Sequence, residues 1–140
     1  MSPQGLALTQ HSDGGSRGNP GPAGAGAVIQ APSGEVVARL GRYLGRTTNN
    51  VAEYQGLLLG LRHALAGGAR EVQVAADSEL MVKQLRGQYQ VKAAHLKPLF
   101  AEARALLGRF DRVEVVHVPR AENAAADQMA NRAVDERLED

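Results

Sequence analysis

Cysteine is absent from the 140-residue sequence. Its absence excludes a disulfide scaffold, a thiolate metal site and a cysteine nucleophile, and it leaves the redox compartment open. The sequence also lacks any apolar run close to the roughly 18 residues that a membrane span needs. The N-terminal stretch 1–8 has neither the basic start nor the apolar centre of a secretory signal. We therefore expect a soluble, cytoplasmic protein that does not bind membranes.

The sequence has no strong excess of charge of either sign. The 16 Lys and Arg residues nearly balance the 15 Asp and Glu residues, which leaves a net charge of +1. The field of the whole molecule is too weak to indicate a polyanionic ligand, so any binding of nucleic acid must be local. Taken singly, the candidate basic residues are most simply solvated surface: Arg39, Arg42, Arg46, Lys83, Arg86, Lys92, Lys97 and Arg120.

The length and the hydrophobic fraction of 44% are ordinary for a globular domain. We expect a single domain over residues 1–140, ordered from about residue 6 to residue 138. No exposed apolar stripe stands out, so we expect a monomer.

Residue patterning predicts the order β, β, β, α, β, α, α, β, α. Alternation and β-rich composition predict strands at 6–13, 24–30, 35–43, 71–76 and 113–118. Three- and four-residue spacings of apolar residues predict helices at 50–66, 78–85, 95–107 and 123–138, the last one capped by Asn123. This order excludes a strictly alternating parallel fold and favours a mixed sheet with helices packed on its faces.

Four acidic residues stand near the ends of predicted elements. Asp13 ends the first strand and Asp77 ends the fourth, so the two lie side by side if these strands are parallel neighbours. Glu53 falls in the first turn of the first helix, and Asp127 falls early in the last helix. Singly, each acid has an ordinary explanation as a turn residue, a helix-start residue, a cap or a surface residue.

Clustered carboxylates are costly to bury unless cations neutralise them. A ligand set made only of oxygen atoms favours a hard ion such as Mg²⁺ or Mn²⁺. Two such ions about 4 Å apart can activate a water and stabilise the leaving oxygen of a phosphodiester, and this chemistry needs no covalent nucleophile.

Four segments resemble, in order and in spacing, the motifs of the type 1 ribonucleases H. The resemblance runs from about residue 8 to residue 134 and rests on DGGSRGNPGPAGAGAVI from Asp13, TTNNVAEYQGLLLGL from Thr47, DSELMVKQL from Asp77 and PRAENAAADQMAN from Pro119. It implies an α/β fold of the ribonuclease H type, with a five-stranded mixed sheet flanked by about four helices. The first strand would lie beside the fourth.

The resemblance also implies an activity. The protein would be an endonuclease that hydrolyses the RNA strand of RNA/DNA hybrids, with two Mg²⁺ ions (or Mn²⁺) bound per site in the presence of substrate. The products would carry 5′-phosphate and 3′-hydroxyl ends. The metal-binding carboxylates would be Asp13, Glu53, Asp77 and Asp127.

Substrate contacts follow from the same resemblance. Asn19, Thr48, Asn49 and Asn50 lie in motifs with which the family contacts RNA 2′-hydroxyl groups and the DNA backbone, and Arg46 and Thr48 resemble its pocket for a DNA phosphate. Asn can both donate and accept, as a 2′-hydroxyl does. We expect Gly14, Gly15 and Gly18 to keep their loop free of bulk, so that a nucleic-acid backbone can approach.

The sequence departs from the family pattern in two places. Many members carry an assisting His in the loop between the last strand and the last helix, where this chain has Arg120, and we assign the assisting role to Arg120. His117 falls in the predicted strand VEVVHV, which favours an ordinary strand-face residue. The basic protrusion of bacterial relatives is reduced to a short segment, 86–97, without Trp. We expect no hybrid-binding domain, because few residues precede the first strand.

Two other functions stay open at this point. A non-catalytic hybrid-binding module is disfavoured, because clustered negative charges that face phosphates would not strengthen the binding of a nucleic acid. A metal nuclease that acts on DNA with the same scaffold is disfavoured by Asn19 and the run 48–50, although the fold alone cannot decide between the two substrates.

Overall fold

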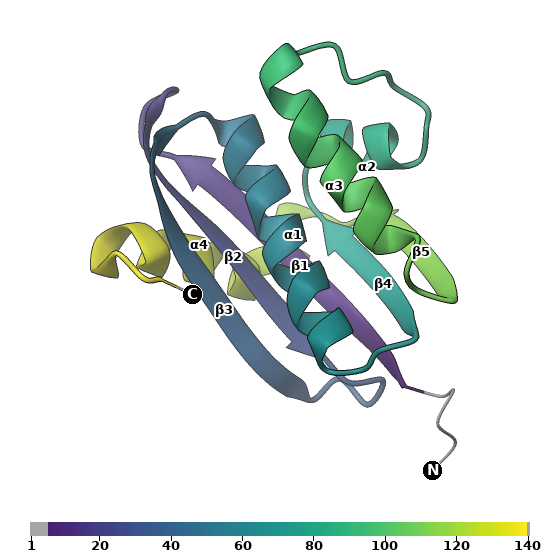
Figure 1. The fold of residues 1–140 in the computed structure, drawn as a ribbon. Coiled ribbons are helices and arrows are strands. Elements are labelled where there is room, and N and C mark those ends of the chain that lie inside the picture. The colour runs from purple at the N-terminus through teal and green to yellow at the C-terminus, as the bar shows by residue number, and fades with distance from the viewer. Residues whose placement is uncertain (1–5, 140) are drawn as a thin grey trace.

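The computed structural model describes residues 6–139, which form a five-stranded sheet in the order β3-β2-β1-β4-β5 (Figure 1). An antiparallel meander is formed by β1 (Ala7–Ser16), β2 (Gly21–Gln30) and β3 (Val36–Thr47). Parallel pairing adds β4 (Glu71–Ala76) beside β1 and β5 (Arg112–His117) beside β4. The mixed sheet and the pairing of the first strand with the fourth are confirmed.

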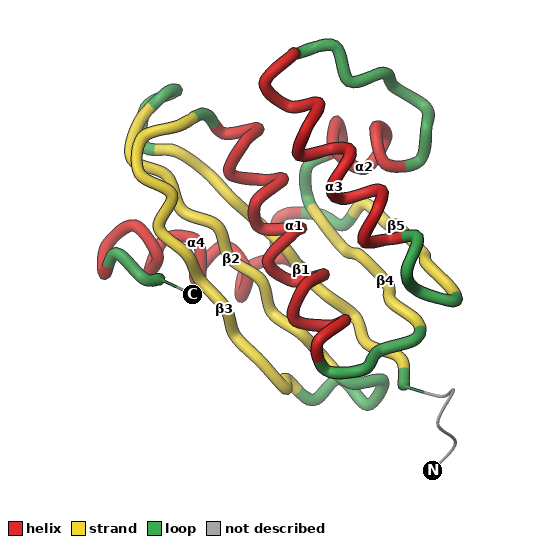
Figure 2. Tube along the Cα trace, viewed as in Figure 1, coloured by secondary structure: helices red, strands yellow, loops and turns green. Residues whose placement is uncertain are grey.

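Helices cover both faces of this sheet (Figures 1 and 2). One face carries α1 (Asn49–Ala66), the short α2 (Glu79–Leu85) and α3 (Lys97–Leu107), whereas α4 (Ala124–Glu136) lies on the other. Two 3₁₀ turns, Ala94–Leu96 and Arg120–Asn123, lead into α3 and α4. All four predicted helices are present, with shifts of a few residues at their ends. None of the helices in residues 6–139 is long and apolar enough to cross a membrane.

The larger core lies between the sheet and the α1 face. It contains fully buried Leu57, Leu58 and Leu61 of α1, packed against side chains of β4 and α3. Each such Leu contributes roughly 1.5–3 kcal/mol through burial of its apolar surface.

The α4 face packs more closely. A Cβ atom on Gly24 would lie 2.4 Å from the carbonyl oxygen of Ala130, and one on Gly26 would lie 2.5 Å from that of Ala126. The glycines of β2 therefore allow the Ala-rich helix to rest on the strand backbone, which fixes where α4 and Asp127 sit.

Three predicted boundaries are wrong. The first strand continues past Asp13 to Ser16, because residues 13–16 pair with residues 23–26 of β2. The second strand begins at Gly21 and the third extends to Thr47, so Arg46 lies in a strand opposite Pro22. Long-range pairing outweighs the turn-forming composition of these glycine-rich segments.

The predicted cap residue of the last helix, Asn123, stands at the N-cap position but does not cap the helix through a hydrogen bond. Its Nδ2 donates to the carbonyl oxygen of Ser12 at 2.9 Å, and its Oδ1 lies 3.3 Å from His11 Nδ1. Asn123 is buried, so its amide is satisfied by β1 and joins the start of α4 to that strand.

The segment after α4 folds back onto the edge of β3. Arg137 takes a left-handed conformation with φ of 51°, and the carbonyl oxygen of Leu138 accepts from the backbone N–H of Tyr43 at 2.6 Å. A single bridge pairs Arg42 with Glu139. Residues 137–139 thus cover part of the outer edge of the sheet.

Candidate active site

The strand register places Asp13 beside Asp77. The parallel ladder between β1 and β4 ends where Ser12 faces Ala76, so the next residue of each strand is an aspartate. On its other side Asp13 still pairs with Gly26 of β2, which keeps its backbone extended. Both carboxylates therefore emerge at one edge of the sheet, as the sequence predicted.

A close approach of α1 to β1 brings Glu53 to the same edge. A Cβ atom on Gly14 would lie 2.0 Å from the carbonyl oxygen of Ala52, so only glycine fits beneath this turn of the helix. The carboxylate oxygens of Asp13, Glu53 and Asp77, called the carboxylate triad below, lie within 4.8 Å of one another. The space at Gly14 is thus filled by α1, which corrects the expectation that it serves the approach of nucleic acid.

Helix caps hold the neighbouring backbone in place. Thr48 caps α1 by accepting from the N–H of Val51 at 3.3 Å, and Ser78 caps α2 by accepting from that of Met81 at 3.2 Å. Asp77 is therefore fixed between the end of a strand ladder and the first turn of a helix.

The carboxylate triad is electrostatically strained. Burial, followed by repulsion from Asp77 and the nearby Asp127, raises the pKa of Asp13 to about 8. Burial and the charge of Asp77 raise the pKa of Glu53 to about 7, although the Ser78 hydroxyl and Arg120 act in the opposite direction. Full ionisation of the triad at neutral pH therefore requires a compensating cation. Three oxygen ligands without His or Cys suit a divalent metal ion.

Asp127 lies beside the triad rather than within it. It occupies the first turn of α4, is exposed and does not belong to the group within 4.8 Å. A hollow of about 110 Å³ at the end of β1 is lined by both Asp13 and Asp127. The Asp127 carboxyl lies close enough to Asp13 to raise its pKa through a side-chain hydrogen bond. The structure thus brings three of the four predicted carboxylates within 4.8 Å of one another and places the fourth beside Asp13.

His117 at the end of β5 and Arg120 just beyond it both approach Asp77. Arg120 Nε lies 3.9 Å from Asp77 Oδ2, and the Arg120 side chain is 91% exposed, so it is free to reach other partners. His117 lies in β5, as predicted, where it is the last residue, and its Nε2 lies 3.3 Å from the carbonyl oxygen of Asp77. Sequence reasoning missed this second contact, which the pairing of His117 with Ala76 makes possible.

The predicted substrate residues surround the start of α1. Asn19 Oδ1 accepts from the N–H of Asn49 at 3.1 Å, and Asn49 Oδ1 accepts from the N–H of Ser16 at 2.7 Å. These contacts connect the β1–β2 turn to α1. Asn50 and Arg46 are exposed at the same end of the sheet.

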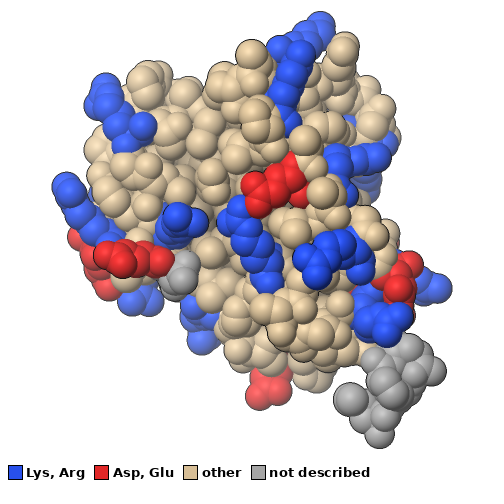
Figure 3. All heavy atoms as spheres, viewed as in Figure 1, with Lys and Arg blue, Asp and Glu red and all other residues tan. Residues whose placement is uncertain are grey.

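Basic side chains are scattered over the face that carries α1 and α3 (Figure 3). They stand singly or in small groups and do not merge into one continuous patch. A nucleic acid lying on this face would therefore meet separate basic side chains.

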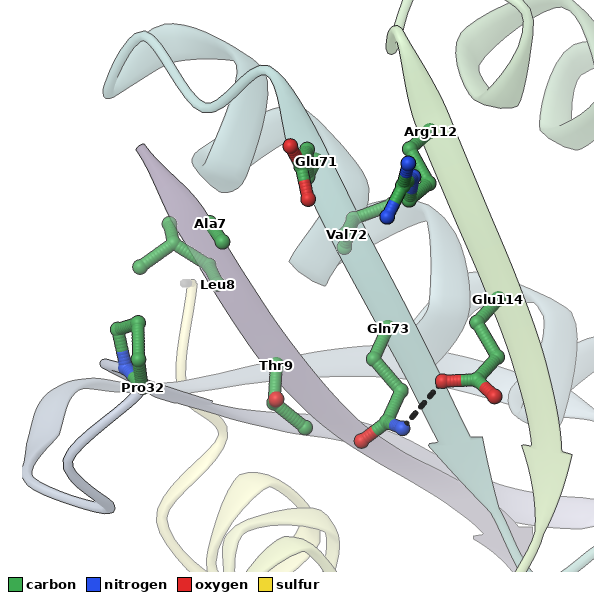
Figure 4. A pocket seen from close by; sticks show the side chains of 9 residues that line it. All are labelled: Ala7, Leu8, Thr9, Pro32, Glu71, Val72, Gln73, Arg112 and Glu114. Carbon is green, nitrogen blue, oxygen red and sulfur yellow. Dashed lines mark hydrogen bonds between the residues drawn. The ribbon is translucent and has the colours of Figure 1, made fainter. Parts of the chain in front are cut away.

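Another hollow, of about 200 Å³, opens at the opposite end of β1, β4 and β5 (Figure 4). There Gln73 Nε2 donates to Glu114 Oε1 at 2.7 Å. Within residues 6–139, the carboxylate triad is the only group of three or more His, Cys, Asp or Glu side chains arranged to hold a metal ion. The candidate metal-binding residues therefore lie at the other end of the sheet, away from this hollow.

Known proteins are similar to this chain in sequence and in fold. A family model described as reverse transcriptase-like matches residues 11–133. The bifunctional protein Rv2228c of Mycobacterium tuberculosis is 50% identical over 125 residues, which make up 89% of this chain and 34% of that protein. The chain thus spans about a third of the length of this curated relative.

Solved structures extend the comparison. The N-terminal RNase H domain of Rv2228c, solved as a fusion with maltose-binding protein, superposes with a TM-score of 0.91 at 46% identity and covers 94% of this chain and 95% of that chain. RNase H1 of Halobacterium salinarum gives a TM-score of 0.90 at 42% identity, covering 93% and 98%. LC11-RNase H1 in complex with an RNA/DNA hybrid gives 0.88 at 42%, covering 94% and 99%. Agreement in sequence and fold over 93–94% of the chain, together with the carboxylate triad, establishes that the chain belongs to the type 1 ribonuclease H family.

Proposed function

We propose that this protein is an endonuclease that hydrolyses the RNA strand of RNA/DNA hybrids and leaves 5′-phosphate and 3′-hydroxyl ends. The observation that carries the proposal is the carboxylate triad, whose oxygens lie within 4.8 Å at one edge of the sheet. A structure that is 42% identical over nearly its whole length was solved with an RNA/DNA hybrid, which supports this substrate. We include in the proposal a single catalytic domain that acts as a monomer in the cytoplasm.

The proposed cofactor is Mg²⁺, with Mn²⁺ as the alternative, and two ions would bind in the presence of substrate. The residues present fit such ions, because the donors are all carboxylate oxygens, and burial together with mutual repulsion raises the pKa of Asp13 and Glu53. Asp13, Glu53 and Asp77 would hold the metal, and Asp127, beside Asp13, would add a fourth carboxylate. Bound divalent ions would supply an activated water and stabilise the leaving oxygen of the phosphodiester.

Around the carboxylates, this chain's other residues would bind and orient the hybrid. The exposed guanidinium of Arg120 can reach a phosphate oxygen or the attacking water on the open side of Asp77. The side-chain amides of Asn19, Asn49 and Asn50 can donate to and accept from 2′-hydroxyl groups, which distinguish RNA from DNA. Arg46 and Thr48 are proposed to contact a phosphate of the DNA strand.

The test is cleavage of end-labelled RNA/DNA hybrid, double-stranded RNA and double-stranded DNA, each with and without Mg²⁺. We expect cleavage of the hybrid only with the metal, and products whose 5′-phosphate is removed by phosphatase. Asp77→Asn should abolish cleavage, whereas Asp111→Asn should not, because Asp111 forms a surface ion pair with Arg70. Preferred cleavage of double-stranded DNA would contradict the proposal, and binding of the hybrid without cleavage would identify a binding module.

A further inference from the structure

A chain of hydrogen bonds runs across the exposed surface of α4 to Asp127. Arg17, which follows β1, donates through Nη1 to Asp135 Oδ1 at 2.6 Å and through Nη2 to Asn131 Oδ1 at 3.3 Å. Asn131 in turn donates through Nδ2 to the carbonyl oxygen of Asp127 at 3.1 Å and to its Oδ2 at 3.4 Å. These four side chains, Arg17, Asp127, Asn131 and Asp135, are called the α4 relay below.

The α4 relay fixes the orientation of the Asn131 amide from both sides. Only the amide oxygen can accept from a guanidinium, and only the amide NH₂ can donate to a carboxylate. Arg17 is itself held by its charge-assisted bond to Asp135, which raises the pKa of Arg17 and lowers that of Asp135. The relay therefore restricts the Asp127 carboxylate to one side of the first turn of α4.

This restriction acts on the carboxylate that the sheet does not position. Asp13, Glu53 and Asp77 are partly buried and set by the strand register and by α1, whereas Asp127 is exposed. Arg17 and Asn131 line the same hollow as Asp13 and Asp127. The relay thus lies at the rim of the hollow that Asp13 and Asp127 both line.

The relay contributes little to stability. The side chains of Arg17 and Asp135 are 50% and 58% exposed, and exposed ion pairs are worth about 0–1 kcal/mol. Substitutions in the relay should therefore leave the fold intact, so that an effect on Asp127 can be measured separately from an effect on folding.

We propose that Asn131 is a positioning residue for Asp127 and that Arg17 fixes Asn131 in the orientation this requires. The inference rests on the proposed function, because the orientation of Asp127 affects turnover only if the carboxylates act on a phosphodiester.

The experiment compares Asn131→Ala, Asn131→Asp, Arg17→Ala and the Arg17→Ala/Asn131→Ala double variant in steady-state cleavage of the hybrid. Asn131→Ala should lower kcat by roughly 3–10-fold with KM nearly unchanged, because an interaction that orients a catalytic group acts on turnover. Arg17→Ala should lower kcat less, and the double variant should be no worse than Asn131→Ala, since both act through one relay.

Two further variants separate positioning from packing. Asn131→Asp can still pair with Arg17 but places a negative charge against Asp127, so it should remain as impaired as Asn131→Ala or become worse. Arg132→Ala is the matched control, because it removes an ion pair to Glu136 on the same helix, with side chains 54% and 50% exposed. Arg132→Ala should keep wild-type kcat.

A readout without metal or substrate completes the test. In NMR relaxation measurements on the metal-free protein, the Asn131 side-chain NH₂ should be ordered in the wild type, mobile in Arg17→Ala and ordered in Arg132→Ala. The inference is overturned by wild-type kcat in Asn131→Ala, by recovery in Asn131→Asp, by additive losses in the double variant or by an effect confined to KM. If the wild-type protein does not cut the hybrid, the proposed function fails, while the NMR comparison still decides whether the relay exists.

Discussion

A Cβ atom on Gly56 would lie 2.3 Å from the carbonyl oxygen of Asp13. Because Gly56 has no side chain, α1 can lie this close to β1. The close approach sets the position of Glu53, which lies one turn before Gly56 on the helix. The geometry of the carboxylate triad thus depends on a residue that carries no functional group.

Gly56→Ala should therefore impair both folding and catalysis. The new methyl group must push α1 away from β1, and we expect a loss of about 1–3 kcal/mol in the free energy of unfolding together with a lower kcat. Urea denaturation and hybrid cleavage measure the two effects. Gly67→Ala is the control at the other end of α1, because its Cβ would meet only ordinary contacts at 3.5 Å or more. Equal behaviour of the two variants would contradict the role of close packing.

The metal-free protein should lose stability as the pH rises. The folded-state pKa values of about 8 for Asp13 and about 7 for Glu53 exceed the ordinary values of 3.8 and 4.5. Between these limits the folded state holds more protons than the unfolded state, so stability falls from about pH 4 to about pH 8 and then levels off. Urea denaturation in a chelator should show this fall, and Asp13→Asn should reduce it.

Mg²⁺ should reverse that loss, because a ligand that binds the folded state stabilises it. Thermal unfolding at a pH near 8 should shift upward with added Mg²⁺ in the wild type and much less in Asp13→Asn. A fall in stability that is the same in Asp13→Asn and the wild type would assign the pH dependence to other groups.

Arg120→Ala should reduce turnover with little change in stability. The side chain is almost fully exposed and its nearest approach to Asp77 is 3.9 Å, so it contributes little to the fold. Removal of a group that orients water or stabilises charge should lower kcat by at least about 10-fold. Arg109→Ala, in the α3–β5 connection, supplies the control. Full activity of Arg120→Ala would contradict this role and favour His117 as the assisting residue, because its Nε2 also approaches Asp77.

Leu138→Ala should lower stability without affecting catalysis. Leu138 packs against the sheet near Gly41, where a Cβ would lie 2.9 Å from Leu138 Cδ1, and its carbonyl binds Tyr43. We expect a loss of about 1–2 kcal/mol, less than for a fully buried Leu, measured by urea denaturation with kcat as the reference. An unchanged free energy of unfolding would show that the segment after α4 is not part of the cooperative fold.

Much of the fold and of the site could be predicted before any tertiary contact was known. Periodicity in 50–66 and 95–107 identified α1 and α3, because apolar spacing along a helix is a local property. The four motifs gave the family, and the positions of Asp13, Asp77 and Glu53 at element ends indicated that they would converge. Strand-end carboxylates on parallel neighbours must meet at one edge, whatever the loops between them do.

The rest was decided by contacts between residues far apart in the chain. Pairing with β2 carries β1 through Gly14 and Gly15 to Ser16, where local composition predicts a turn. Asn123 binds Ser12, which is 111 positions away, so no local capping rule could identify its partner.

Asp127 shows the same division most clearly. The sequence by itself determined that this chain carries four candidate metal-binding carboxylates on a ribonuclease H scaffold. Residue type and the order of helices and strands can be recognised from local sequence. Only the tertiary structure decided that three of them share a site within 4.8 Å while Asp127 lies beside Asp13, with its carboxylate bound by Asn131. The distance between side chains on different elements is set by how closely those elements pack, and that depends on contacts a linear pattern does not contain.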